Sequence, residues 1–451
     1  MSSIALFSRY KSLTLLAVLK KTIFDTVNTF LYELKKEDLM KVLKVKFSNL
    51  ALFKEDLVID FSAQNRISRE AREDLIQITG PVYTNPVIEL AGLNASGKTV
   101  TLRLLYLALD LLNGINLNSS RYKHTVIEMI KEKPIEITLW FYLNNNFYIL
   151  QTAIDKQKSR DGLINPNLII QHEELYTQNT KRVTKGNWNI DPSNNADQAF
   201  YKFLKNREKV ELPDDLSIIF SYSKHNNSKT YDFICDVNHN FLRLEGDYYP
   251  EVIKFLDPSI ERFDCNRDEN GNVKSYSLKF VTNDKVYTLS RFGELENYLS
   301  SGTIKGISLF TISIFAFLNG GYVFVDELEN HFNLEIVKTL IRFFLNKTTN
   351  HGGGTLVFST HYPELLDIPP RNDAVYILKN QSGITCENLT KLLSRNDGIK
   401  RSEAFITDQL KGTAPSYGHY MNLKTLIKNQ YSEDNKGLEA KSAEVIDADK
   451  R

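Results

Sequence analysis

The chain is poor in cysteine. Its 451 residues include three, Cys235, Cys265 and Cys386, which lie far apart and are odd in number. No CxxC pair occurs, so neither a disulfide framework nor a zinc site is indicated. A reducing cytoplasm is the compartment that best fits this cysteine usage.

The chain also lacks an excess of positive or negative charge. The 56 lysines and arginines balance 55 aspartates and glutamates, which leaves a net charge of +1. There is therefore no bulk electrostatic attraction to nucleic acid or to an acidic membrane. Net charge neither supports nor excludes nucleic-acid binding through a local basic patch.

Long apolar runs are missing as well. The longest, at residues 307–318, is too short for a membrane span and contains three hydroxyl side chains. A shorter run at 13–19 is closed by Lys20-Lys21 and has no small-residue cleavage site after it, so no signal peptide is predicted. We expect a cytoplasmic protein with no membrane partner.

The most informative feature that is present is the octapeptide GLNASGKT at positions 92–99. It fits the phosphate-loop pattern of glycine, four residues and Gly-Lys-Ser/Thr. An apolar stretch at 86–91 predicts a buried strand before it, and residues 100–109 predict a helix after it. The glycines let backbone N–H groups converge on phosphate oxygens, and the helix N-terminus adds partial positive charge. The expected nucleotide-binding residues are Gly92, Asn94, Ala95, Ser96, Gly97, Lys98 and Thr99.

A second motif supplies the metal half of such a site. Residues 321–325 form an apolar stretch that ends in Asp326 and Glu327. The Thr99 hydroxyl and Asp326 are the expected Mg²⁺ ligands, and Lys98 is expected to reach the outer phosphates. Glu327 would orient or deprotonate the attacking water. An acidic helix N-cap is the alternative for the acid pair alone, and the phosphate loop favours the catalytic interpretation.

Two more segments follow in the expected order. Ser300 and Gly302 lie at a small-residue start before an apolar helix predicted at 304–318, where a helix N-terminus can bind an anion. An ordinary N-cap is the alternative there. A buried strand predicted at 355–360 ends in His361, and a histidine in that place can contact a γ-phosphate.

These segments together resemble the ATP-binding-cassette (ABC) superfamily, and within it the soluble heads of the RecF, SMC and OLD type. The chain is most similar to the AAA-labelled ATPases of bacterial abortive-infection and anti-phage systems. The matching pieces are the Walker A loop 92–99, the signature 299–303, the Walker B acids Asp326 and Glu327, the switch histidine His361 and the opening strands at 41–61.

The sequence departs from the family pattern in three places. Ser301 replaces the second glycine of the signature, and no Q-loop glutamine is evident, with Gln151 and Gln171 as candidates. The histidine-proline pair common after Walker B reads His331-Phe332-Asn333 here, which puts a D-loop role for His331 in doubt.

The resemblance implies an α/β fold, an ABC-type ATPase head with a mixed β-sheet, an antiparallel β-subdomain and a helical or irregular insertion. The expected parts are a helical extension at 1–38, an N-lobe with Walker A at 39–154, an insertion or lid at 155–250, a C-lobe with the signature, Walker B and H-loop at 251–431, and a disordered tail at 432–451.

The resemblance also implies ATP and Mg²⁺ as cofactors and a head-to-tail homodimer, with a higher oligomer as the alternative. Ser300 and Gly302 of one subunit would act on ATP held by Lys98 of the other, and hydrolysis would reopen the dimer. No nuclease-like segment follows residue 425, so a separate effector such as a nuclease or toxin is expected.

The leading hypothesis is a sensor or regulatory ATPase of anti-phage defence, and the alternative is a RecF/SMC-like DNA-repair or recombination ATPase. A transporter subunit is disfavoured by the altered signature, the missing Q-loop and the predicted insertion.

Overall fold

The computed structural model describes residues 40–157, 166–179, 183–184, 186–189, 201–209, 211–223, 228–234, 250–269, 273–330, 332–393, 398–414 and 417–430. The helical extension expected at 1–38, the tail expected at 432–451 and His331 lie outside these residues.

A six-stranded sheet forms the centre of the molecule. Its order is β10 (Thr230–Phe233), β14 (Gly321–Val325), β15 (Gly354–Thr360), β5 (Val87–Ala91), β16 (Val375–Asn380) and β17 (Ile384–Asn388). The first five strands are parallel, and β17 is antiparallel to β16. Every residue of β5, β14 and β15 is buried, as expected for parallel strands covered on both faces. Their carboxyl ends share one edge of the sheet.

A second six-stranded sheet is antiparallel throughout. Its order is β2 (Leu57–Asp60), β1 (Lys41–Ser48), β6 (Ile135–Leu143), β7 (Asn146–Lys156), β8 (Leu168–Asn179) and β9 (Lys202–Asn206). The hairpin between β6 and β7 turns through Asn144 and Asn145, both with positive φ, which asparagine tolerates in tight hairpin turns. The predicted α/β class with a mixed sheet is confirmed.

The polar segment predicted as an insertion contributes three strands to these sheets. Strands β8 and β9 extend the antiparallel sheet, and β10 pairs with β14 at the edge of the parallel one. The sequence pattern did not predict β8, because this strand carries a polar run at 171–174. It did not predict β9 either, and the first three residues of β9 are all exposed rather than alternately buried. The division into five parts stays a prediction.

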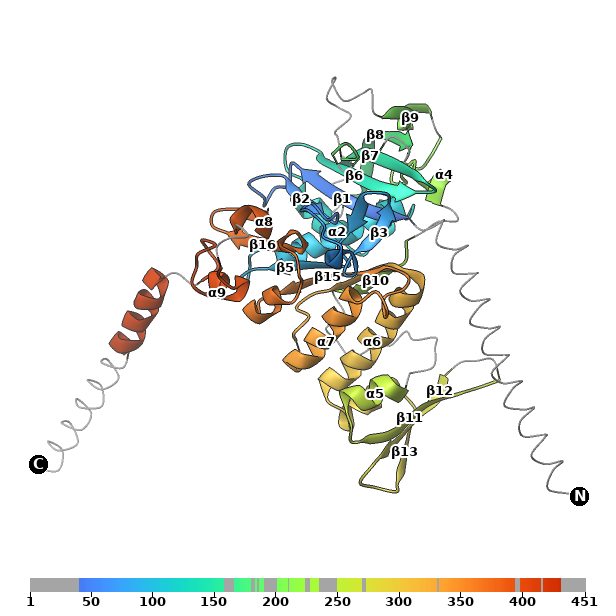
Figure 1. Ribbon diagram of the computed structural model, residues 1–451, viewed down its shortest axis with the longest axis vertical. Helices are drawn as coiled ribbons and strands as arrows, with labels where there is room; N and C mark the ends of the chain where they lie inside the picture. The colour runs from blue at the N-terminus through green and yellow to red at the C-terminus, as the bar shows by residue number, and fades with distance from the viewer. Residues whose placement is uncertain are drawn as a thin grey trace, which may run out of the picture.

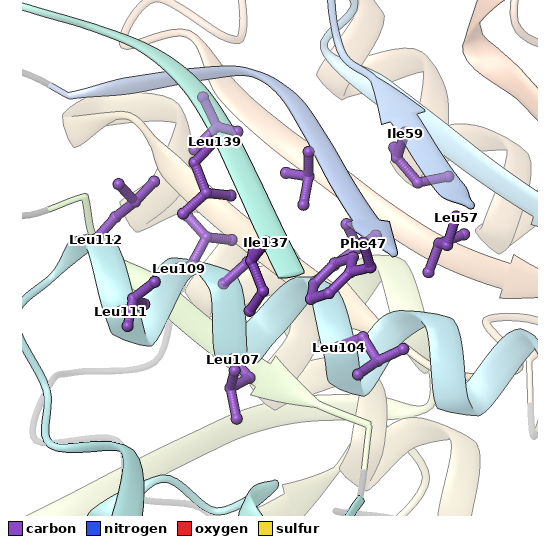
Figure 2. Packing of buried hydrophobic residues seen from close by; sticks show 14 of the residues in the cluster. Phe47, Leu57, Ile59, Leu104, Leu107, Leu109, Leu111, Leu112, Ile137 and Leu139 are labelled. Carbon is purple, nitrogen blue, oxygen red and sulfur yellow. The ribbon is translucent and has the colours of Figure 1, made fainter. Parts of the chain in front are cut away.

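Helix α2 (Lys98–Leu112) lies between the two sheets (Figure 1). Its leucines pack against Phe47 of β1 and Ile137 of β6 (Figure 2), and the same cluster includes Ile88 of β5 and Val357 of β15. Eleven of its fifteen residues are buried, because a helix covered on two sides is apolar nearly all round. The loop before α2 is therefore anchored to both sheets.

Two long helices, α6 (Ser301–Asn319) and α7 (Leu334–Leu345), cover the opposite face of the parallel sheet (Figure 1). Helix α6 is longer than the apolar run predicted from sequence, and by length and composition it could cross a membrane. However, 61% of its most apolar window is buried inside the protein, where it packs on β14 and β15 as a core helix.

A small three-stranded antiparallel sheet packs on the start of α6. Ile304 and Ile307 of α6 share its hydrophobic cluster with residues of β11 (Ile260–Arg267), β12 (Val273–Phe280), β13 (Val286–Leu289) and α5 (Pro250–Leu256). The remaining strands and helices are β3 (Ile76–Thr79), β4 (Val82–Thr84), α3 (Lys123–Met129), α4 (Phe220–Ser223), α8 (Leu389–Leu392), α9 (Arg401–Ile406) and a helix at 417–430.

Two buried tyrosines of the parallel sheet hold the antiparallel sheet in place. The Tyr322 hydroxyl accepts a hydrogen bond from the backbone N–H of Val42 at 2.8 Å, where the pairing of β1 with β6 is irregular. The Tyr376 hydroxyl accepts from the N–H of Asp60 at 2.7 Å. Each bond satisfies a buried backbone donor, so both fix the two sheets relative to each other.

Glu89 lies in the middle of β5 with its carboxyl fully buried. Neither carboxylate oxygen has a hydrogen-bond partner among the residues that the structure describes. Burial raises the pKa of Glu89 from 4.5 to about 8, and nearby Arg401 opposes that shift only in part. The folded state therefore binds a proton that the unfolded chain releases between pH 4.5 and 8.

We predict that the wild-type protein loses unfolding free energy as pH rises from about 4.5 to about 8, by up to about 4 kcal/mol from Glu89 alone. Glu89→Gln should match the wild type below that window and be more stable than it at pH 9. Urea denaturation across the pH range measures this. The exposed Glu136 provides the matched Glu136→Gln control, and equal pH slopes in the wild type and Glu89→Gln would contradict the prediction.

Candidate functional site

The loop between β5 and α2 turns through backbone conformations that favour glycine. Gly97, the N-cap of α2, has φ of 99°, and Ala95 has φ of 60°. A Cβ on Gly92 would lie 2.4 Å from the carbonyl oxygen of Leu378, which belongs to the backbone of β16 and cannot move aside. The residues between β5 and α2 thus form a tight turn of the kind predicted from sequence, and position 92 accepts only glycine.

Lys98 folds back over this loop. Its Nζ donates to the carbonyl oxygens of Gly92 at 2.8 Å and Leu93 at 3.0 Å. Burial lowers the pKa of Lys98, while Glu327 and Asp326 oppose the shift by attracting its charge. The buried Ser96 hydroxyl has no hydrogen-bond partner within the described chain, so a polar atom inside the loop is left for a ligand.

Asp326, directly after β14, accepts hydrogen bonds from two hydroxyl groups. Thr99 Oγ1 donates to its Oδ2 at 2.6 Å, and Ser359 Oγ donates to its Oδ1. Ser359 also accepts from the N–H of Glu327 at 2.7 Å. Strand β15 carries Ser359 between β14 and β5, which places the serine within reach of both acids. Sequence reasoning missed Ser359, because nothing in its local pattern shows which strands are neighbours.

Glu327 is held in an unusual backbone conformation. Its φ is 46°, in the left-handed region, which costs a non-glycine residue about 1–2 kcal/mol. Its N–H is bonded to Ser359, and its Oε2 accepts a hydrogen bond from the Asn330 side chain. The carboxylate is therefore fixed from both the backbone and the side-chain end.

His361 follows β15 and contacts a third acid, Glu329. The backbone N–H of His361 donates to Glu329 Oε1 at 2.8 Å, and its Nδ1 lies 2.9 Å from the same oxygen without hydrogen-bond geometry. Glu329 is buried. Sequence reasoning assigned it no role, although it is the third acid within four residues and that spacing was a usable signal.

Ser300 and Gly302 form the start of α6. Ser300 is the N-cap, and its exposed side chain accepts from the N–H of Thr303 at 3.0 Å, whereas Gly302 is buried in the first turn. Within one chain, Ser300 therefore acts as an ordinary N-cap, which was the alternative interpretation of this segment. The glutamine candidates lie in the antiparallel sheet, Gln151 in β7 and Gln171 in β8, where Gln171 bonds Asp155 at 2.6 Å.

The donor set suits a magnesium ion. The Thr99 hydroxyl and the Asp326 carboxylate offer two oxygen atoms that meet at 2.6 Å between the loop and the acid-tipped strand. Mg²⁺ is usually bound by one or two such protein oxygens and completes its shell with water and phosphate oxygens. The residues present fit that ion together with a nucleotide.

The placement of α2 between a parallel and an antiparallel sheet, with a serine-bearing strand separating the loop strand from the acid-tipped strand, defines an ABC-type ATPase head. More particularly, the chain belongs to the family described as "AAA domain, putative AbiEii toxin, Type IV TA system", whose profile matches residues 89–367, more than half of its length.

Solved structures give a weaker likeness. The chain is similar to the SMC head domain from Thermotoga maritima at 11% identity, with a TM-score of 0.36, over 77% of this chain and 98% of that one. The comparison with curated proteins gives no match.

Gly92→Ala should lower the affinity for ATP at least about tenfold, since a methyl group 2.4 Å from the Leu378 carbonyl must displace the loop. Titration calorimetry with Mg·ATP measures the change. Gly186→Ala is the control, because a Cβ there meets open space. Wild-type affinity in Gly92→Ala would show that the loop does not hold the nucleotide.

Proposed function

We propose that this protein binds and hydrolyses ATP with Mg²⁺ and uses the cycle as a dimerisation switch. We further propose that it is a cytoplasmic sensor or regulatory subunit of an anti-phage system with a separate effector. The observation that carries the ATPase proposal is the 2.6 Å contact between Thr99 and Asp326. It joins two motifs 227 residues apart in sequence at the point where a phosphate-bound Mg²⁺ would be held.

Each residue at the sheet edge then has a distinct role. The loop N–H groups bind phosphate oxygens, and Lys98 exchanges its two carbonyl partners for the outer phosphates. Thr99 and Asp326 would hold the ion, which would supply positive charge against the charge that develops on the phosphate oxygens. Glu327, whose carboxylate is already oriented, positions or deprotonates the attacking water, and His361 contacts the γ-phosphate.

The start of α6 supports a role for a second subunit. Ser300 is exposed at the N-terminus of a 19-residue helix, where the helix dipole favours an anion. In a head-to-tail dimer, Ser300 and Gly302 would bind the γ-phosphate of ATP held by the other copy. ATP would then join the two heads, and hydrolysis would separate them.

The defence role rests on the family. The family description names a toxin of the AbiEii kind and a type IV toxin–antitoxin system, which supports a part in abortive infection. No observation on this chain favours the DNA-repair alternative, which predicts salt-sensitive DNA binding.

Glu327→Gln should keep ATP bound but lower hydrolysis at least about a hundredfold, because the metal ligand Asp326 stays while the water loses its base. The variant should accumulate as an ATP-bound dimer. Light scattering with and without Mg·ATP measures the mass, and Lys98→Ala serves as the variant that binds ATP poorly. An unchanged mass of Glu327→Gln on adding ATP would contradict the switch.

A mixture of Lys98→Ala and Ser300→Arg subunits should recover ATPase activity that neither homodimer has. In a head-to-tail heterodimer, one site carries both changes and the other carries none. If Ser300 acts on its own chain's nucleotide, every site carries a lesion and no activity returns. Mixtures with Glu327→Gln test whether the two sites are coupled, and full activity of the Ser300→Arg homodimer would refute the signature role.

A further inference from the structure

Lys305 lies one turn into α6, on the helix that starts with Ser300 and Gly302. Its side chain is half-buried and reaches across to the segment after Walker B. The Nζ donates to the backbone carbonyl of Asn330 at 3.4 Å and sits 5.6 Å from the centre of the Phe332 ring. Neither the phosphate loop, the signature nor Walker B includes this lysine.

The surroundings of Lys305 are acidic and partly shielded from water. Burial lowers the pKa of its ammonium group, and the charges of Glu329, Asp326 and Glu327, in that order, oppose the shift. Three carboxylates at the sheet edge thus attract one lysine on α6. A cation shielded in this way interacts with the acids more strongly than an exposed surface lysine would.

Asn330 connects this lysine to the candidate base. Its backbone N–H donates to the carbonyl oxygen of Glu327 at 2.9 Å, and its side-chain amide donates to Glu327 Oε2. The backbone carbonyl of Asn330 accepts a hydrogen bond from the ammonium group of Lys305. A continuous chain of three contacts therefore runs from α6 through Asn330 to the Glu327 carboxylate.

We propose that Lys305 is a positioning residue that couples the start of α6 to Glu327 through Asn330. This rests on the proposed ATPase function. When Ser300 and Gly302 engage the nucleotide of a second copy, any shift of the first turn of α6 moves Lys305, and with it the Asn330 turn. Ser300 and Gly302 of one head contact the nucleotide held by the second head. That nucleotide thereby sets the orientation of Glu327 in the first head.

Lys305→Met tests the charge alone, since methionine keeps an apolar stem to cover Phe332. The expected result is a kcat about tenfold lower with the KM for ATP within about twofold of wild type, because the phosphate loop is untouched. Lys305→Arg, which keeps the charge, should recover most of the kcat. Lys338→Met on α7 is the matched control, because that lysine pairs with Glu335 on its own helix and has no contact with the loop 92–99, Asp326 or Glu327 among the residues that the structure describes.

The link through Asn330 is tested by a double-mutant cycle. Asn330→Ala should lower kcat to a similar extent, and the double variant Lys305→Met/Asn330→Ala should be little worse than either single variant, since both remove one pathway. The active-site concentration is measured by ATP binding, so that partial unfolding is not counted as lost kcat. A merely structural role would lower that concentration and leave kcat per bound site unchanged.

Two results overturn the proposal without touching the ATPase function: wild-type kcat in Lys305→Met, or fully additive losses in the double variant. If the wild-type protein shows no hydrolysis that Lys98→Ala abolishes, the ATPase function fails and the coupling fails with it. A lowered kcat that arginine restores, together with non-additive losses, supports the coupling.

Discussion

The candidate site depends on the position of β15 between β5 and β14. All three strands are parallel, so the phosphate loop, Asp326 and His361 emerge at one edge. Ser359 in the middle strand bonds both Walker B residues at once, through the Asp326 carboxylate and the Glu327 N–H. In this strand order Ser359 stands between the loop at 92–99 and Asp326 and bonds the acid to the middle strand.

The rest of the fold keeps the carboxyl-terminal edge of these three strands in place. Helix α2 is buried against both sheets, and the hydroxyls of Tyr322 and Tyr376 tie the parallel sheet to the backbone of β1 and β2. On the other face, α6 and α7 cover the sheet, and the segment between β14 and α7 carries the acids. The parts of the site that must stay rigid are therefore packed from two sides, whereas Ser300 is exposed at the start of α6.

Local patterns in the sequence predicted much of this arrangement. The apolar strands, the apolar helices that follow residues 99 and 303, and the loop 92–99 each carry their signal within a few residues. The missed residues, Ser359, Glu329, Asn330 and Lys305, act through partners about 25 or more residues away or through a backbone turn that no pattern reveals. Strands β8 and β9 were missed because their polar faces do not alternate cleanly. Strand order, rather than local propensity, decides which side chains meet.

The pairing of β5 has a consequence for how the chain matures. Its two neighbours, β15 and β16, begin at residues 354 and 375, so β5 has no partner until those residues have left the ribosome. Until then an apolar strand with open edges is exposed to other chains, and such long-range parallel pairing forms slowly. The sheet edge that carries the loop 92–99 can therefore form only after residues 354–380 have been synthesised, and a chain that stops before β15 is a candidate for chaperones or aggregation.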